Sequence, residues 1–176
     1  MSVGYRAVQW NSHKLRYDAV AAGLVLLFIA SFIGLSSVLH AGDHAIAAPV
    51  LLIRATGACA IVLLHIALCI GPAARLDRRF LPLLANRRHL GVLTFLVGLL
   101  HAVLVLGYYH GFGDDNPAVS LLHNTFTGPA DLLSVRRFPF ELLGAAALAI
   151  LFLMAATSHD FWLKNLSPST WKRLHM

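Results

Sequence analysis

The sequence predicts an all-α polytopic membrane protein, a bundle with four transmembrane helices in this chain. Hydrophobic residues make up 58% of the 176 residues, charged residues only 12%, and the mean hydropathy is +0.71. A soluble domain typically carries about 25% charged residues. The apolar residues gather in four blocks, each long enough to cross about 30 Å of hydrocarbon as a helix. The blocks cover residues 19–39, 50–70, 90–109 and 138–157.

The positions of the basic residues predict how these helices are oriented. The chain has 14 Lys and Arg against 8 Asp and Glu. Most of the basic residues lie before the first block, between the second and third, and after the fourth. By the positive-inside rule this places the N-terminus, the 71–89 loop and the C-terminus in the cytoplasm. Topology therefore accounts for the basic excess, so the expected partner is the lipid bilayer and not a nucleic acid.

The same pattern divides the chain into three parts. Residues 1–17 are predicted to form a cytoplasmic or interfacial segment, residues 18–158 the transmembrane domain, and residues 159–176 a cytoplasmic tail. The first block is too long for the apolar region of a signal peptide, so an uncleaved first helix is predicted. The ending "WKRLHM" is typical of the approach to another membrane helix. We therefore expect a fifth helix to be missing and the chain to be truncated from a larger bundle.

The connections follow from breakers and turn residues. The second helix is predicted to stop at Gly71-Pro72, because this pair disfavours further helix. The 71–89 loop has apolar residues between its charges, so it is expected to skim the membrane surface. The longest outer connection, 111–137, contains the turn sequence "GDDNP".

Two of the ten histidines lie inside apolar blocks. His101 lies eleven residues beyond Leu90, about 16 Å into the membrane and near its midplane. His65 lies six residues before Gly71, about 9 Å from the inner boundary. An ionisable residue at such depth is a functional candidate by default. The structural alternative is a neutral imidazole bonded to a Ser or Thr of a neighbouring helix. Antiparallel second and third helices would place both histidines in the same half of the bundle.

Small residues lead up to His101 along one helix face. Gly91, Thr94, Gly98 and His101 fall within about 80° of each other around an α-helix. This face permits close helix packing, and it equally leaves room for a flat macrocycle beside the imidazole. His110 follows nine residues later, about 180° round the helix, so it is not expected to extend this face.

Haem b is the cofactor that best fits an isolated membrane imidazole. Haem iron accepts a neutral imidazole as an axial ligand, whereas zinc requires three or four protein ligands. No carboxylate lies near the middle of any block, as a proton relay would need, and the CxxCH motif of c-type haem is absent. Arg54, at the start of the second helix, is the candidate partner for a haem propionate. Its alternative role is a snorkelling boundary residue.

Three stretches carry a resemblance to a known family. They are "RATGACAIVLLHIALCIGPAARL", "RRHLGVLTFLVGLLH" and "ATSHDFWLKNLSPSTWKRLH". Together they resemble the ferric reductase-like transmembrane domain family, whose bacterial members include MsrQ-like haem-binding membrane proteins. The resemblance implies a bundle in the bacterial inner membrane that binds haem b and carries electrons. It makes His101 an axial ligand and matches His175 to a histidine at the start of the fifth helix.

The chain also departs from the family pattern. The family's other axial histidine lies further along the fifth helix, past the last residue of this chain. His65 matches no expected ligand; it is predicted either to ligate iron or to pack against the macrocycle edge. The ending also resembles the membrane half of proteins that continue into a Rieske-type [2Fe–2S] domain. A missing C-terminal redox domain is therefore one expected partner.

These observations give three hypotheses for function. The first is a b-type haem electron-transfer protein, an oxidoreductase component that takes electrons from quinol or a cytoplasmic redox partner. It would have no catalytic residues of its own, since no flavin or nicotinamide fingerprint is present. The second is a non-redox anchor or assembly subunit with structural histidines. The third, a transporter, lacks the broken helices expected at depth.

Overall fold

The computed structural model describes residues 12–42, 45–111, 116, 119 and 140–158, and this part of the chain contains helices and no strand. The elements are α1 (Ser12–Leu39), α2 (Ala48–Leu76), the 3-10 turn η2 (Arg78–Phe80), α3 (Leu81–Ala85), α4 (Arg87–Val105), the π-helical turn η3 (Leu106–His110) and α6 (Phe140–Thr157). The predicted all-α class is confirmed.

Four of these helical segments are long and apolar enough to cross a membrane. They are Lys14–Leu39, Ala48–Leu76, Arg87–His110 and Phe140–Thr157. Each contains most or all of one predicted apolar block, so the predicted polytopic helical membrane bundle is confirmed. Some of the helices run beyond the apolar blocks, because polar residues at the boundary continue the same backbone hydrogen bonds.

The predicted end of the second helix at Gly71-Pro72 is wrong. The helix α2 continues to Leu76 with Pro72 inside it. A proline this close to the C-terminal end removes the hydrogen bond of only one N–H group. The following residues, Ala73 and Ala74, are strong helix formers, which favours continuation of the helix past Pro72.

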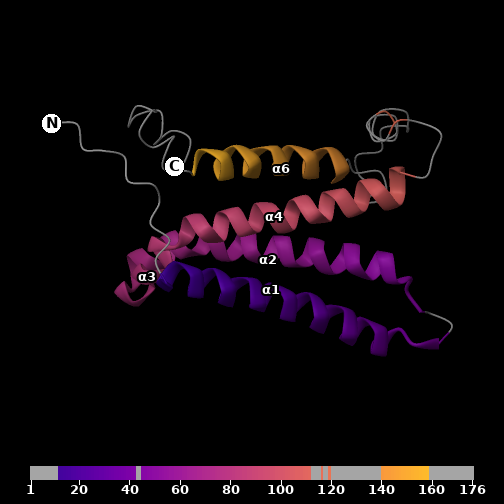
Figure 1. The fold of residues 1–176 in the computed structure, drawn as a ribbon, viewed down its shortest axis with the longest axis horizontal. Helices are drawn as coiled ribbons and strands as arrows, with labels where there is room; N and C mark the ends of the chain where they lie inside the picture. Colours follow the sequence, from indigo (N-terminus) through magenta and orange to yellow (C-terminus); the bar gives the residue numbers. More distant parts are fainter. Residues whose placement is uncertain (1–11, 43–44, 112–115, 117–118, 120–139, 159–176) are drawn as a thin grey trace.

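The four long helices lie side by side in the order α1, α2, α4, α6, as Figure 1 shows. Each packs chiefly on its neighbour in the chain, and α1 makes only minor contact with α4. Successive helices run antiparallel in this view. The pair α2 and α4 therefore forms the centre of the molecule, and many side chains of α1 and α6 are exposed apolar groups suited to lipid.

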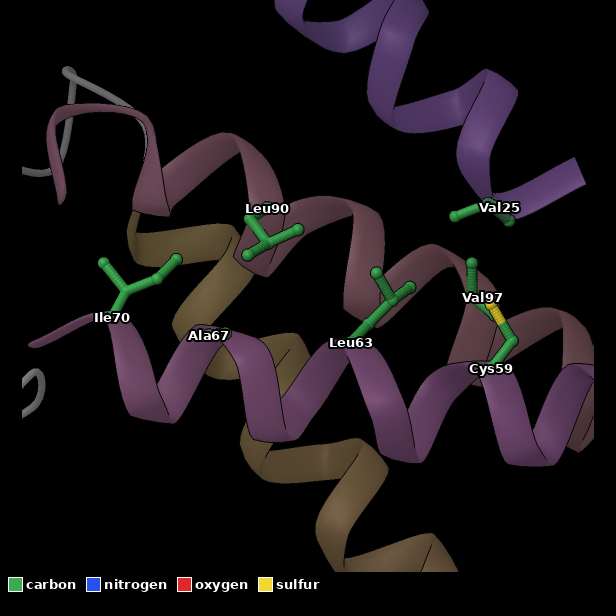
Figure 2. Close-up of a cluster of buried hydrophobic side chains, with 7 residues drawn as sticks. All are labelled: Val25, Cys59, Leu63, Ala67, Ile70, Leu90 and Val97. Atoms are coloured by element: carbon green, nitrogen blue, oxygen red, sulfur yellow. The ribbon is translucent and has the colours of Figure 1, made fainter. Parts of the chain in front are cut away.

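The buried core lies where α1, α2 and α4 meet. It is formed by Val25, Cys59, Leu63, Ala67, Ile70, Leu90 and Val97. Figure 2 shows the four α2 residues in a line along the face turned toward α4. Their spacing of three or four residues is that of one helical face. This stripe holds α2 against α4. It therefore fixes which residues of the two helices lie opposite each other along their length.

The short segments between α2 and α4 form a compact turn. The carboxylate of Asp77 accepts a hydrogen bond from the backbone N–H of Arg79 at 2.9 Å, which caps η2. Four large apolar side chains of η2 and α3 are exposed: Phe80, Leu81, Leu83 and Leu84. Exposed apolar side chains beside arginines suit a segment that rests on a lipid surface. The position of this loop at the membrane surface stays a prediction.

An ion-pairing contact ties α1 to α4 at the same end of the molecule. Nδ1 of His89 lies 3.0 Å from both carboxylate oxygens of Asp18, and the ring of Tyr17 meets the His89 ring edge-on at 6.5 Å. Because α1 and α4 make little other contact, this cluster helps to hold the two helices together.

We expect Asp18→Asn to lower the free energy of unfolding by about 1 kcal/mol. Hydrogen bonds to charged groups contribute about 1.5–3 kcal/mol, and partial solvent exposure of both side chains reduces this. Thermal unfolding in detergent, in a double-mutant cycle with His89→Ala, measures the coupling. A coupling energy of zero would mean that the contact does not stabilise the bundle.

Candidate functional site

The candidate site is centred on His101, which α4 presents to the backbone of α2. Nδ1 of His101 lies 3.0 Å from the carbonyl oxygen of Ile53. It also lies 3.4 Å from the hydroxyl oxygen of Thr56. His101 itself is half-buried, whereas Ile53 and Thr56 are buried. The histidine is therefore anchored through one ring nitrogen to the neighbouring helix.

These contacts determine which ring nitrogen carries the proton. The carbonyl oxygen of Ile53 can only accept a hydrogen bond, so Nδ1 must donate, and it carries the proton in the neutral ring. Nε2 then keeps its lone pair. A histidine that binds a metal characteristically donates its other N–H to a backbone carbonyl or carboxylate in this way. His101 thus offers Nε2 as a metal ligand or hydrogen-bond acceptor.

Gly57 makes the close approach of the imidazole possible. A Cβ atom placed on Gly57 would lie 2.8 Å from Cε1, 3.1 Å from Nδ1 and 3.3 Å from Nε2 of His101. The first of these distances is shorter than van der Waals contact allows. The ring therefore lies directly against the α2 backbone, in space that any other residue type would occupy.

The predicted small-residue face of α4 is divided between two partner helices. Thr94 is buried, with its hydroxyl donating to the Leu90 carbonyl of its own helix at 2.8 Å. At Gly98 an added Cβ would lie 3.6 Å from Leu148 of α6. At Gly91 it would meet nothing within 4 Å. The face thus serves contacts with α6 as well as α2, and the His101 imidazole fills space on the α2 side.

His65 does not share the site of His101. It is exposed, and its Nδ1 lies 2.7 Å from the Ile61 carbonyl of its own helix. It follows Gly57 by eight residues, about 12 Å along α2. No hydrogen bond joins the two histidines in the described part of the chain. The role of His65 as an iron ligand stays a prediction.

Arg54 and His175 are the two other predicted site residues. Arg54 directly follows Ile53 on α2 and is exposed, so its side chain is free of the helix interface; its pairing with a propionate stays a prediction. His175 lies outside the described residues.

The turn η3, which follows the C-terminal end of α4, carries a polar contact that was not predicted from the sequence. His110 is buried, and its Nε2 lies 3.4 Å from a carboxylate oxygen of Glu141 at the start of α6. The π-helical turn at Leu106–His110 turns the chain less per residue than an α-helix. The 180° separation predicted for His110 assumed a regular α-helix. Glu141 is the sequence feature that could have indicated this contact, since it is the only acidic residue in any apolar block.

The donor set at His101 fits a haem. Among the described residues, no three His, Cys, Asp or Glu side chains gather into a metal site. A haem takes its equatorial ligands from the macrocycle and needs only axial ligands from the protein. One neutral imidazole with Nδ1–H fixed and a lone pair on Nε2 can supply such a ligand from one side.

Comparisons with known proteins agree with this chemistry. Residues 56–176 match the family model of the ferric reductase like transmembrane component. The chain is also similar to the protein-methionine-sulfoxide reductase heme-binding subunit MsrQ of Ralstonia nicotianae, with 31% identity over 159 residues. That alignment covers 89% of this chain and 65% of the relative's length. No solved structure matches the chain significantly. Since the family model covers well over half of the residues and begins at Thr56, beside His101, the chain belongs to the ferric reductase-like transmembrane family.

Proposed function

We propose that this chain binds haem b between its membrane helices and carries electrons through the membrane as a component of an oxidoreductase. Nε2 of His101 is the proposed axial ligand. The observation that supports this most is the 3.0 Å contact between Nδ1 of His101 and the Ile53 carbonyl. It fixes the tautomer and the ring plane, as expected for an iron-binding imidazole. The name of the relative, a haem-binding subunit, points to the same cofactor.

In this proposal the chain's own residues bind and orient the cofactor. The α2 backbone holds His101 in one orientation, and the apolar helices around it exclude water. Arg54 is the proposed partner of a propionate. His65 is proposed either to ligate iron or to pack against the macrocycle edge, and His175 is a proposed cofactor-binding residue. When bound, haem supplies reversible one-electron transfer. The donor is proposed to be quinol or a cytoplasmic redox partner, with a Rieske-type [2Fe–2S] domain as one candidate.

The proposed place of the protein is the bacterial inner membrane, with both termini in the cytoplasm. The distribution of Lys and Arg supports this orientation. The relative is named as a subunit of a protein-methionine-sulfoxide reductase. We propose that this chain likewise delivers electrons to a separate catalytic protein.

A second candidate function rests on the same contact. An imidazole that bonds a carbonyl and a hydroxyl of a neighbouring helix also stabilises a membrane bundle with no cofactor. In that case the chain is an anchor or assembly subunit. The two functions differ in whether Nε2 of His101 binds iron.

The visible spectrum of the purified chain separates them. The protein is expressed with haem supply, purified in detergent, and measured oxidised and after dithionite reduction. A sharp reduced α band, with a pyridine haemochrome spectrum of haem b, is the expected result. The same measurement is made on a protein extended through the expected fifth helix. A folded, monodisperse protein that takes up no haem in either form would contradict the electron-transfer function and favour the anchor. Reduction by a short-chain quinol in place of dithionite then tests the proposed donor.

A further inference from the structure

We propose that Thr56 and Gly57 are positioning residues for His101, which set the orientation and the donor strength of its Nε2. This inference rests on the proposed function, because it concerns the imidazole as an iron ligand. It goes further by assigning to two α2 residues the control of haem affinity and midpoint potential. Neither residue would touch the iron; both act through the ring of His101.

Gly57 sets where the ring lies. Three ring atoms of His101, Cε1, Nδ1 and Nε2, lie within 3.3 Å of the position that a Cβ on Gly57 would take. The clash cannot be relieved by swinging the ring freely, because Nδ1 is held by the Ile53 carbonyl at 3.0 Å. A methyl group at this position must therefore either break that hydrogen bond or displace Nε2 from its place. Both changes weaken binding of a metal at Nε2.

Thr56 sets how strongly the ring donates. Its hydroxyl oxygen lies 2.9 Å from the Leu52 carbonyl and 3.0 Å from the Ile53 carbonyl, so its single proton is directed to its own helix. The lone pairs of that oxygen remain for the Nδ1–H of His101 at 3.4 Å. Because Thr56 is fully buried, no water competes for them.

The Nδ1–H group therefore faces two acceptors from one turn of α2. Two acceptors restrict rotation of the ring more than one does. They also draw the Nδ1 proton away from the ring, which makes Nε2 a stronger electron donor. A stronger donor favours oxidised over reduced iron and lowers the midpoint potential. Removal of the Thr56 hydroxyl is expected to raise that potential.

Thr94 provides a matched control for this effect. It is the same residue type, it is 1% exposed compared with 0% for Thr56, and its hydroxyl donates to a carbonyl of its own helix. Its one hydrogen bond stays within α4. Thr94→Val and Thr56→Val thus remove the same buried hydroxyl, but only the second removes an acceptor from His101.

The first experiment measures the midpoint potential and the reduced visible spectrum of the haem-loaded full chain. We expect Thr56→Val to raise the potential and shift the spectrum, Thr56→Ser to restore both, and Thr94→Val to leave both unchanged. Equal potentials for Thr56→Val and Thr94→Val would overturn the role of Thr56. A shift that Thr56→Ser does not reverse would also overturn it, because it would reflect altered packing and not the hydroxyl.

The second experiment measures haem affinity by titrating haem into haem-free protein. We expect Gly57→Ala to bind haem about 10–100-fold more weakly, as when an outer partner of a metal-bound histidine is lost. Gly23→Ala on α1 is the control, because its Cβ would meet nothing within 4 Å and it lies outside the small-residue face of α4. Thermal unfolding of the haem-free variants establishes that both are folded. Equal affinities for the two alanine variants would overturn the role of Gly57.

Failure of this inference is distinguishable from failure of the proposed function. If His101→Ala keeps its haem, His101 is not the ligand and the proposed function fails. If His101→Ala loses haem while the Thr56 and Gly57 variants behave like their controls, only the positioning role fails.

Discussion

Replacing His101 with alanine is expected to remove the bound haem and the reduced α band with it. Alanine cannot ligate iron, and the loss should exceed the roughly 100-fold that follows loss of a ligand's hydrogen-bond partner. The substitution also leaves the Ile53 carbonyl and Thr56 hydroxyl without the imidazole. Both groups keep hydrogen bonds within α2, so the haem-free protein should fold. The reduced spectrum and the haem-to-protein ratio of the purified variant test this.

Two other histidine variants test whether loss of haem is specific to His101. His65→Ala tests the proposed alternative ligand. His40→Ala is its matched control, since Nδ1 of each bonds a carbonyl four residues earlier and both side chains are exposed. Loss of the α band in His65→Ala but not in His40→Ala would identify His65 as a ligand. An unchanged α band in His101→Ala would contradict the assignment of the site to α4.

Replacing Ala55 with phenylalanine is expected to give the largest loss of stability. Ala55 is fully buried, one residue before Thr56 on α2, and α2 lies between α1 and α4. A phenyl ring there must push a neighbouring helix away, and overpacking of this kind typically costs about 1–3 kcal/mol. It would also displace the α2 backbone that holds His101, so haem binding should fall together with stability.

Ala149→Phe on α6 is the control for this substitution. Ala149 is exposed and belongs to an apolar face suited to lipid, so the added ring should leave the free energy of unfolding nearly unchanged. Thermal unfolding of the haem-free proteins in detergent compares the two variants. Equal midpoints of unfolding would show that α2 is not packed at Ala55 as the structure describes.

The helices themselves were predictable from the sequence. Apolar blocks of membrane-spanning length, separated by charged or turn-forming segments, identify all four long helices within a few residues at most ends. This works because lipid offers no hydrogen-bonding partner to the backbone, so an apolar segment of that length has little choice but to be helical. The error at Gly71-Pro72 arose because a proline near a helix end removes too little hydrogen bonding to stop the helix.

The rotation of each helix was much less predictable. A soluble helix shows its buried face by apolar residues that recur every three or four positions among polar ones, but a membrane helix is apolar all round. The stripe from Gly91 to His101 was recognisable as a set, yet its division between α2 and α6 was not. Likewise the phase of His110 depends on the π-helical turn, which periodicity does not indicate.

By itself the sequence determined that the chain is a polytopic helical membrane protein with one histidine deep in its third apolar block, and which family it resembles. Only the tertiary structure decided what that histidine touches. Ile53 and Thr56 are 48 and 45 residues away from His101 in the chain. Their meeting depends on the level at which α2 and α4 pack, which is set by the stripe from Cys59 to Ile70 against α4. Side-chain packing between helices is a property of both surfaces together, so neither segment alone indicates it.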